Sequence, residues 1–433
     1  MAEESLQQRL ERARQLMAAR RVDGQPSTGS GAVQPRTGWE ADPAAAELRQ
    51  RQLQLQQLGL ANPYFRAHES VSGDTIRVDG RELLNFSGYN YLGLSGHPEV
   101  SAAAKAAIDQ FGTSASGSRL ASGETPLHGE LERSLASLLG VEACLVFVSG
   151  YGTNVSTIGH LLGRRDLVVH DALAHSSILA GCQLSGAHRL PFRHNSPEAL
   201  EAVLSEHRRT YERALIVVEG VYSMDGDIAP MKEFVDIKHR HDAALMVDEA
   251  HSLGVLGDRG AGVGEHFRLS PTDVDVWMGT LSKALAACGG YVAGSANLIE
   301  YLRFTAPGFI FSVGLPPADT AAALAALRIM LREPERVDRV RLRGAHFLAR
   351  ARARGLNTGA SDGSAVVPVI IGDSLRAIRV AQNLFEAGIN VQPIVYPAVD
   401  EQAARLRYFI TASHTEAQIE RAVDATAEAL CAS

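Results

Sequence analysis

Short apolar runs alternate with longer amphipathic segments along most of the chain, from about residue 75 onward. The clearest runs are CLVFVSG, LVVHDA, ALIVVEG, ALMVDEA, VWMGTLS and YVAGS. Each is apolar throughout rather than at every second position, which is typical of strands covered on both faces. Because segments of helix length separate the runs, the pattern predicts an α/β domain with a doubly wound, mostly parallel sheet over residues 101–330.

The last part of the chain, residues 331–433, has a different pattern. The runs VVPVIIG, INVQPIVYP and LRYFITAS lie between helical patterns such as EAQIERAVDATAEAL. This mixture predicts a smaller C-terminal α+β domain. We expect residues 46–100 to form an N-terminal segment that packs on this smaller domain.

The first residues, 1–45, have the pattern of a short helix followed by a flexible linker. Leu6, Leu10, Ala13 and Met17 recur at helical spacing, and the stretch VDGQPSTGSGAVQPRTG is rich in Gly, Ser and Pro. A second helical pattern follows at AAAELRQRQLQLQQLGL. Two interpretations stay open, a dispensable tail or an element that docks a partner protein.

Charge and cysteine spacing narrow the class of protein. The formal net charge of −7 argues against nonspecific binding to nucleic acid, which needs a basic face. No run of 18 apolar residues occurs, so no membrane span is expected, and the charged N-terminus is unlike a signal peptide. The cysteines lie far apart, without metal-ligand spacing, and we expect reduced thiols in a cytoplasmic protein that holds no metal. They are Cys144, Cys182, Cys288 and Cys431.

Unusual polar residues follow each central run. The endings are SGYGTN, HDALAHSS, EGVYSMDGD, DEAHSLG and GTLSKA. In open α/β sheets ligands bind outside the carboxyl ends of the strands, so these endings are expected to meet at one pocket. Taken singly, each residue has a structural explanation: Asp248 could be satisfied by backbone donors, and His175 or His251 could be a hydrogen-bonded core histidine.

Lys283 raises a sharper question, because GTLSKALAACGGYVAGS places it among small and apolar residues. Such a lysine either snorkels to water or performs chemistry. A lysine whose pKa is lowered by burial can form a Schiff base with an aldehyde, and Asp248 is suited to keep a ring nitrogen protonated. These features describe pyridoxal phosphate (PLP). Its phosphate would be bound by Ser149, Gly150, Tyr151 and Gly152 at a strand-to-helix junction and by the hydroxyls of Thr280 and Ser282.

At these residues the chain resembles the α-oxoamine synthases, which are fold-type I PLP enzymes. The likeness runs from about Asn62 to the C-terminus. The family includes serine palmitoyltransferase, amino-oxononanoate synthase, 2-amino-3-ketobutyrate CoA ligase and aminolevulinate synthase. The motifs that carry the resemblance are NFSGYNYLGLSGHP, GTSASGSRLASGETPLHGELE, VFVSGYGTNVSTIG, VVEGVYSMDGDIAP, MVDEAHSLGVLG, GTLSKALAACGG and APGFIFSVGLPP.

The resemblance implies a role for each matching residue. Lys283 would carry the cofactor, Asp248 would pair with the pyridine nitrogen, and His175 would stack on the ring face. His251 would approach the phenolic oxygen, and Ser223 would lie near that oxygen and the substrate. Phosphate contacts would come from Ser149, Gly150, Tyr151, Thr280 and Ser282, and, in a homodimer with shared active sites, from Ser312 across the interface.

The substrate carboxylate is bound in this family by an arginine of the C-terminal domain. Alternation along the strand puts Arg405 and Arg407 on one face, and the family pattern favours Arg407. A guanidinium binds a carboxylate bidentately, which orients an amino acid. Asn90 is a candidate helper.

The resemblance implies a decarboxylative condensation of serine, alanine or glycine with an acyl thioester of CoA or a carrier protein. The products would be an α-aminoketone, CO2 and a free thiol, with Lys283 removing the α-proton. The stretch SASGSR, in place of GSGGSR, favours the serine palmitoyltransferase-like branch and also resembles versions found with polyketide assembly lines. An aminotransferase of the same fold is the alternative. A catalytically dead partner subunit would be expected to lack Lys283.

Overall fold

The computed structural model describes residue 38 and residues 42–432, which fall into two units divided between Gly59 and Leu60. In the first unit, helix α2 (Pro43–Gln57) begins after Asp42, whose side chain accepts a hydrogen bond from the backbone N–H of Ala44. This confirms the helix predicted from AAAELRQRQLQLQQ. The helix predicted from the spacing of Leu6 to Met17 lies outside the described residues.

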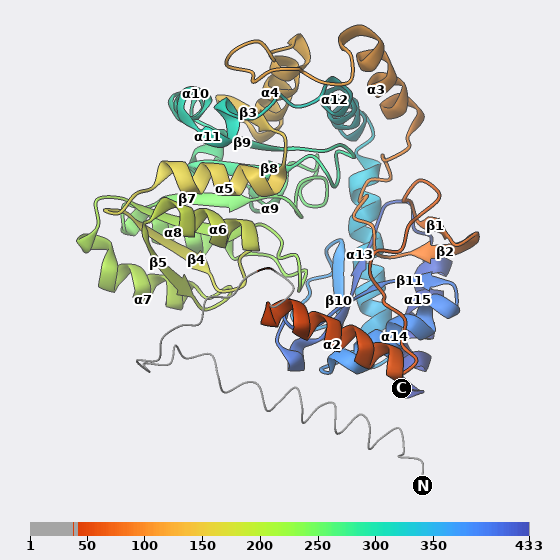
Figure 1. Cartoon of the computed structure of the whole chain (residues 1–433). Coiled ribbons are helices and arrows are strands. Elements are labelled where there is room, and N and C mark those ends of the chain that lie inside the picture. The colour runs from red at the N-terminus through yellow and green to blue at the C-terminus, as the bar shows by residue number, and fades with distance from the viewer. Residues whose placement is uncertain (1–37, 39–41, 433) are drawn as a thin grey trace. The chain divides into compact units, whose positions relative to one another are not determined.

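The second unit contains a seven-stranded sheet in the order β3-β9-β8-β7-β6-β4-β5 (Figure 1). Only β9 runs against its neighbours, so the predicted mostly parallel sheet and its predicted strands are confirmed. The strands are β3 (Ala143–Phe147), β4 (Leu167–Asp171), β5 (His188–Phe192), β6 (Ala214–Glu219), β7 (Ala244–Asp248), β8 (Val276–Thr280) and β9 (Gly290–Gly294).

Helices cover both faces of this sheet (Figure 1). Along β6, Leu215 and Val217 belong to one buried cluster, whereas Ile216 and Val218 belong to another. Both sets of side chains are therefore removed from water, which explains why the strand is apolar throughout. The first cluster includes α5 (Gly150–Leu161), α6 (Ser176–Ser185), α10 (Ala296–Thr305) and α11 (Pro307–Ile310). The second includes α4 (Pro126–Leu139), α7 (Pro197–His207), α8 (Met231–Arg240), α9 (Val263–Phe267) and α12 (Pro317–Arg332), which packs on α3 (Pro98–Phe111).

The C-terminal part of this unit has a core of its own. An antiparallel sheet in the order β10-β13-β12 packs with three helices around Phe347, Leu406 and Tyr408. A second small sheet joins residues from before position 100 to this region, because β2 pairs in parallel with β11. The elements are β1 (Thr75–Val78), β2 (Arg81–Asn85), α13 (Glu335–Ala353), β10 (Val366–Ile370), α14 (Ser374–Glu386), β11 (Ile389–Asn390), β12 (Gln392–Ile394), β13 (Arg405–Phe409) and α15 (Glu416–Cys431).

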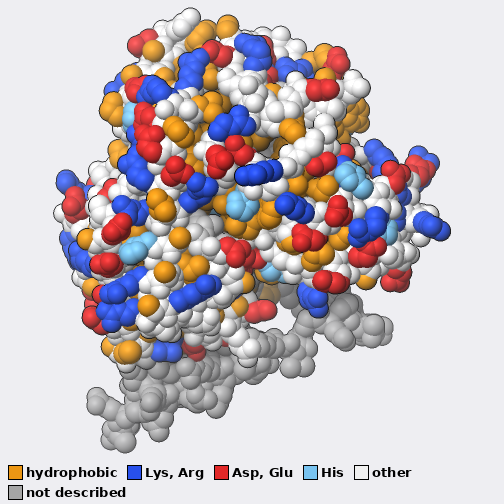
Figure 2. Space-filling view, turned by 180° about the vertical axis from the view of Figure 1, so that it is seen from behind, with side chains coloured by type: hydrophobic (Ala, Val, Ile, Leu, Met, Phe, Trp, Pro, Cys, Tyr) orange, Lys and Arg blue, Asp and Glu red, His pale blue; other side chains and the backbone are white. Residues whose placement is uncertain are grey.

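Charges of both signs are interspersed over the face drawn in Figure 2. Several exposed arginines of the second unit have acidic partners, such as Arg332 with Glu99 at 2.7 Å and Arg354 with Asp424 at 2.8 Å. Among the described residues, the helices include none with the length and apolar character that a membrane crossing requires.

Candidate active site

Four neighbouring parallel strands end in polar residues at one edge of the large sheet. The last residues are Asp171 of β4, Glu219 of β6, Asp248 of β7 and Thr280 of β8. Glu219 and Asp248 lie directly opposite each other in the strand register. The convergence predicted from the run endings is therefore present at this edge.

Lys283 follows β8 by three residues and is partly buried. In the described chain its ammonium has no hydrogen bond or ion pair, and the ring of Tyr89 lies 5.9 Å from Nζ. Burial lowers the pKa of Lys283 to about 8, although the carboxyl groups of Asp248 and Glu219 act in the opposite direction. The amine is thus available as a nucleophile near neutral pH.

Two donors hold the buried carboxyl group of Asp248. Its Oδ1 accepts from the backbone N–H of Ala250 at 2.9 Å, and its Oδ2 accepts from Nδ2 of Asn154 at 2.8 Å. Asn154 comes from α5, so a helix of the first apolar cluster orients the carboxylate at the end of β7. An oriented, buried carboxylate is the group that a protonated ring nitrogen requires.

His175 is the N-cap of α6 and lies at the end of the β4 loop. Its backbone N–H donates to Oε1 of Glu219 at 2.7 Å, and its Nδ1 lies 2.7 Å from Oγ of Ser177. The pKa of His175 is lowered from 6.5, because burial of the imidazole outweighs the opposite effect of the Asp248 carboxylate. Burial, together with the charge of Asp248, raises the pKa of Glu219 to about 8. At neutral pH both groups are therefore mainly uncharged.

His251 is held by Tyr91, and both side chains are buried. The Tyr91 hydroxyl lies 2.6 Å from Nδ1 of the imidazole. Burial raises the pKa of Tyr91 and lowers that of His251, which Lys283 and Arg407 lower further. The hydroxyl therefore keeps its proton, and the imidazole is neutral.

The start of α5 forms a compact cradle against the end of β8. Ser149 caps the helix and accepts from the backbone N–H of Gly152 at 3.2 Å. A Cβ added at Gly150 would lie 2.7 Å from Oγ1 of Thr280, so only glycine allows this approach. The hydroxyl oxygens of Thr280 and Ser282 lie 2.8 Å apart. Backbone N–H groups, two hydroxyls and the positive end of a helix suit a phosphate group.

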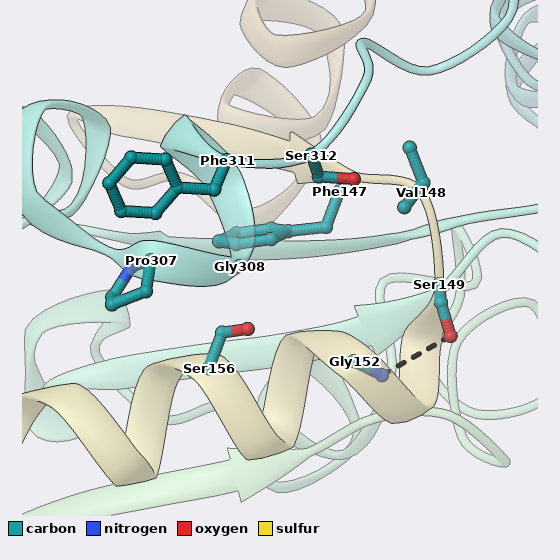
Figure 3. A pocket seen from close by; sticks show the side chains of 9 residues that line it. All are labelled: Phe147, Val148, Ser149, Gly152, Ser156, Pro307, Gly308, Phe311 and Ser312. Carbon is teal, nitrogen blue, oxygen red and sulfur yellow. Dashed lines mark hydrogen bonds between the residues drawn. The ribbon is translucent and has the colours of Figure 1, made fainter. Parts of the chain in front are cut away.

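Ser312 lies beside this cradle, on a hollow of about 250 Å³. Figure 3 shows Ser312 and Phe311, which follow α11, on the side of the hollow opposite α5. Phe311 is 84% exposed. The hollow adjoins the cradle, because its lining includes Ser149 and Gly152 but not Lys283 or Asp248. The lining residues are Phe147, Val148, Ser149, Gly152, Ser156, Pro307, Gly308, Phe311 and Ser312.

Arg405 and Arg407 both reach the loop after β6, as the predicted alternation along the strand requires. Arg405 pairs with Asp225 at 2.6 Å. Arg407 donates to the backbone oxygen of Ser223 at 3.1 Å, but it has no acidic partner within the described chain, and its buried Nε has no hydrogen-bond partner there. Of these two guanidinium groups, that of Arg407 is therefore the one whose charge is not paired within the described chain, and a guanidinium can bind a carboxylate by two hydrogen bonds.

Asn90 joins its own loop to the segment that precedes β1. Its Nδ2 donates to the backbone oxygen of Ser72 at 3.1 Å, and its Oδ1 accepts from the N–H of Ser95 at 3.1 Å. These bonds position the loop that carries Tyr89 and Tyr91. A role for Asn90 in substrate binding stays a prediction.

Some groups of the site were not singled out from the sequence. Each lies inside a quoted motif, but nothing in the pattern distinguishes it from its neighbours. They are Tyr91, Asn154, Ser177 and Glu219.

The described residues fit PLP by the chemistry of their donors. The cradle suits the phosphate, Asp248 suits the ring nitrogen, and the unpaired amine of Lys283 suits the aldehyde.

Comparison with known proteins agrees with this fit. Residues 81–425 match the family "Aminotransferase class I and II". The 8-amino-7-oxononanoate synthase of Geobacter sulfurreducens is 43% identical over 376 residues, which cover 86% of this chain and 95% of that protein. The enzyme of the same name from Thermoanaerobacter pseudethanolicus is 40% identical over 357 residues, covering 82% and 90%.

Solved structures give the same result. A serine palmitoyltransferase of S. paucimobilis with bound PLP and myriocin superposes with a TM-score of 0.86 at 33% identity, covering 90% of this chain and 99% of that one. The 8-amino-7-oxononanoate synthase of Francisella tularensis gives a TM-score of 0.69 at 27% identity, covering 80% and 97%.

The chain belongs to the aminotransferase class I and II family. Within that family it is an α-oxoamine synthase with the fold of type I PLP enzymes, and it is a PLP-dependent C-acyltransferase. The predicted fold class, enzyme class and cofactor are confirmed.

Proposed function

We propose that the residues at this sheet edge condense a small L-amino acid with an acyl thioester, and that an α-aminoketone, CO2 and a free thiol leave the site. The observation that carries this proposal is a pair of cations that lack an acidic partner. Lys283 and Arg407 have no acidic partner within the described chain, so one amine and one guanidinium are free for the cofactor and an amino acid carboxylate.

PLP, when bound, supplies an electron sink that stabilises negative charge at the α-carbon of an attached amino acid. Lys283 would bind the aldehyde carbon through Nζ and, once released, remove the α-proton from the substrate. Asp248 would keep the proton on the pyridine nitrogen. His175 would cover the ring face, and His251 and Ser223 would lie at the phenolic oxygen.

The phosphate would be bound by the cradle of Ser149, Gly150, Tyr151, Thr280 and Ser282. Arg407 would hold the substrate carboxylate by two parallel hydrogen bonds. A fixed carboxylate sets which bond at the α-carbon is aligned for cleavage, and it thereby delays decarboxylation until the acyl group has been added.

The names of the relatives suggest which amino acids to test. In 8-amino-7-oxononanoate the amine is next to the ketone and one methyl carbon follows, which is the pattern left by alanine after loss of CO2. The serine palmitoyltransferases name serine and a palmitoyl group. Alanine and serine are therefore the first amino acids to compare, with glycine as the third amino acid expected from the sequence.

The test uses full-length protein supplied with PLP, each of these amino acids and an acyl-CoA. Free thiol and CO2 released in equal amounts, both abolished by Lys283→Ala, are the expected result. A keto acid without thiol would instead support the aminotransferase alternative. Thiol release that persists in Lys283→Ala would contradict the role of the lysine.

We also propose a homodimer in which Ser312 contacts the phosphate bound by the other subunit. The exposed ring of Phe311 beside Ser312 supports a contact surface at this position. The test uses a heterodimer of a Ser312→Ala chain and a Lys283→Ala chain. The site of the Ser312→Ala chain keeps its own lysine and faces the intact Ser312 of the Lys283→Ala chain. We expect this site to bind PLP with the affinity of the wild type. An affinity equal to that of the Ser312→Ala homodimer would contradict the proposal.

A cytoplasmic location is part of the proposal. It is supported by the four cysteines of the chain, all of which are free thiols, as a reducing compartment would keep them.

A further inference from the structure

A chain of hydrogen bonds joins His175 to Asp248 behind the proposed PLP site. Nδ1 of His175 lies 2.7 Å from Oγ of Ser177, and Nδ2 of Asn154 donates to that oxygen at 2.9 Å. The same Nδ2 donates to Oδ2 of Asp248 at 2.8 Å. The two residues proposed to contact the ring, one at its face and one at its nitrogen, are thus connected through two buried side chains, Asn154 and Ser177.

The direction of these bonds can be worked out from the donors. The backbone N–H of Ser177 points to Nδ1 of His175 at 3.3 Å, and an N–H can only donate, so Nδ1 must carry a lone pair. The Ser177 hydroxyl accepts from Asn154 and therefore has its own proton to give to Nδ1. With Nδ1 an acceptor, the neutral ring of His175 has its proton on Nε2.

The orientation of the Asn154 amide follows from Asp248. A carboxylate is an acceptor, so the NH2 end of the amide must face it. The other end, Oδ1, is buried without a hydrogen-bond partner in the described chain. An unpaired buried carbonyl is unfavourable. Its presence indicates that the bonds from Nδ2 to Asp248 and Ser177 set the orientation of the amide, at the expense of a partner for Oδ1.

We propose that Asn154 and Ser177 are positioning residues that hold His175 as the neutral tautomer protonated on Nε2 and tie this tautomer to the carboxylate of Asp248. The inference rests on the proposed function for its meaning in catalysis. His175 then offers the site a hydrogen-bond donor rather than a base, and the removal of the α-proton is left to Lys283.

The test reads the proton directly. Full-length protein labelled with 15N-histidine and supplied with PLP is measured at pH 7 by long-range 1H–15N correlation. The chain has 15 histidines, and His175→Gln identifies the signals of this ring. We expect an unprotonated Nδ1 and a protonated Nε2 in the wild type. In Ser177→Ala we expect signals of both tautomers, because only the longer backbone bond remains.

Asn154→Ala should raise the dissociation constant of PLP by roughly tenfold to a hundredfold, because Asp248 loses a charge-assisted hydrogen bond. Thr157→Val is the matched control. Thr157 lies on the same helix, is fully buried, and has a hydroxyl without a partner in the described chain. We expect this variant to keep both the tautomer and the PLP affinity within twofold.

A wild-type ring protonated on Nδ1, or charged at pH 7, would overturn the inference. An unchanged tautomer in Ser177→Ala would contradict the positioning role of Ser177. Wild-type PLP affinity in Asn154→Ala would contradict the proposed link between Asn154 and the carboxylate of Asp248. Failure of the proposed function would give a different result. If the protein shows the expected tautomer and PLP affinity but releases no thiol, only the acyl transfer is contradicted.

Discussion

Arg405 and Arg407 lie two residues apart on β13, yet within the described residues only Arg405 pairs with a carboxylate, that of Asp225 at 2.6 Å. Arg407→Lys keeps the charge but loses the fork geometry. We expect the KM for the amino acid to rise about tenfold to a hundredfold in steady-state assays, as for loss of a charge-assisted bond. Arg405→Lys is the control and should lower stability with KM nearly unchanged. Equal effects of both changes on KM would contradict the assignment.

The lowered pKa of Lys283, about 8, predicts how the protein takes up its cofactor. Only the unprotonated amine attacks the aldehyde of PLP, so the rate of uptake by PLP-free full-length protein should rise with pH through about 8. A lysine with an unperturbed pKa would show this rise at a pH of about 10.4. Stopped-flow absorbance between pH 6 and pH 10 measures it, and a midpoint near that of free lysine would show that burial does not tune this amine.

Tyr91→Phe should alter the cofactor's surroundings as well as stability. The change leaves Nδ1 of His251 without its hydrogen-bond partner, and a buried unsatisfied group costs about 1–3 kcal/mol. We expect that loss in urea unfolding, together with a shifted absorbance of bound PLP. Tyr408→Phe is the control, because its buried hydroxyl bonds Thr426 at 2.6 Å in the smaller core. It should lower stability without a spectral shift.

Glu219 should make the protein less stable at higher pH. Its pKa is raised from 4.5 to about 8 in the fold, so between these values the folded state binds more protons than the unfolded state. The free energy of unfolding therefore falls as pH rises through this window. Glu219→Gln should reduce the fall between pH 5 and pH 9, whereas Glu300→Gln, exposed on α10, should not. An unchanged pH profile in Glu219→Gln would contradict the shift.

The large sheet could be predicted because its central strands are buried on both faces, which forces them to be apolar throughout. The edge strand β5, with the sequence HRLPF, was not predicted. It carries a proline, and its first two side chains are exposed, so the apolar signal that marks the other strands is weak.

The site was predictable to the extent that its residues end strands. Lys283, Asp248 and His175 stand out by residue type at those ends. Asn154 does not, because an asparagine inside a helix has many explanations, and its role depends on two partners distant in the sequence. The preference for Arg407 over Arg405 came from the family pattern, because no spacing along β13 can reveal the ion pair of Arg405 with Asp225.

The residues proposed to bind PLP from one chain lie between Ser149 and Lys283, around a single sheet, whereas the arginine proposed for the substrate lies on β13, next to Leu406 and Tyr408 of the smaller core. Across evolution, such an enzyme can acquire a new amino acid substrate through changes around β13 while the cofactor residues of the large sheet are inherited unaltered. The same separation makes the segment around β13 the natural target for a directed library.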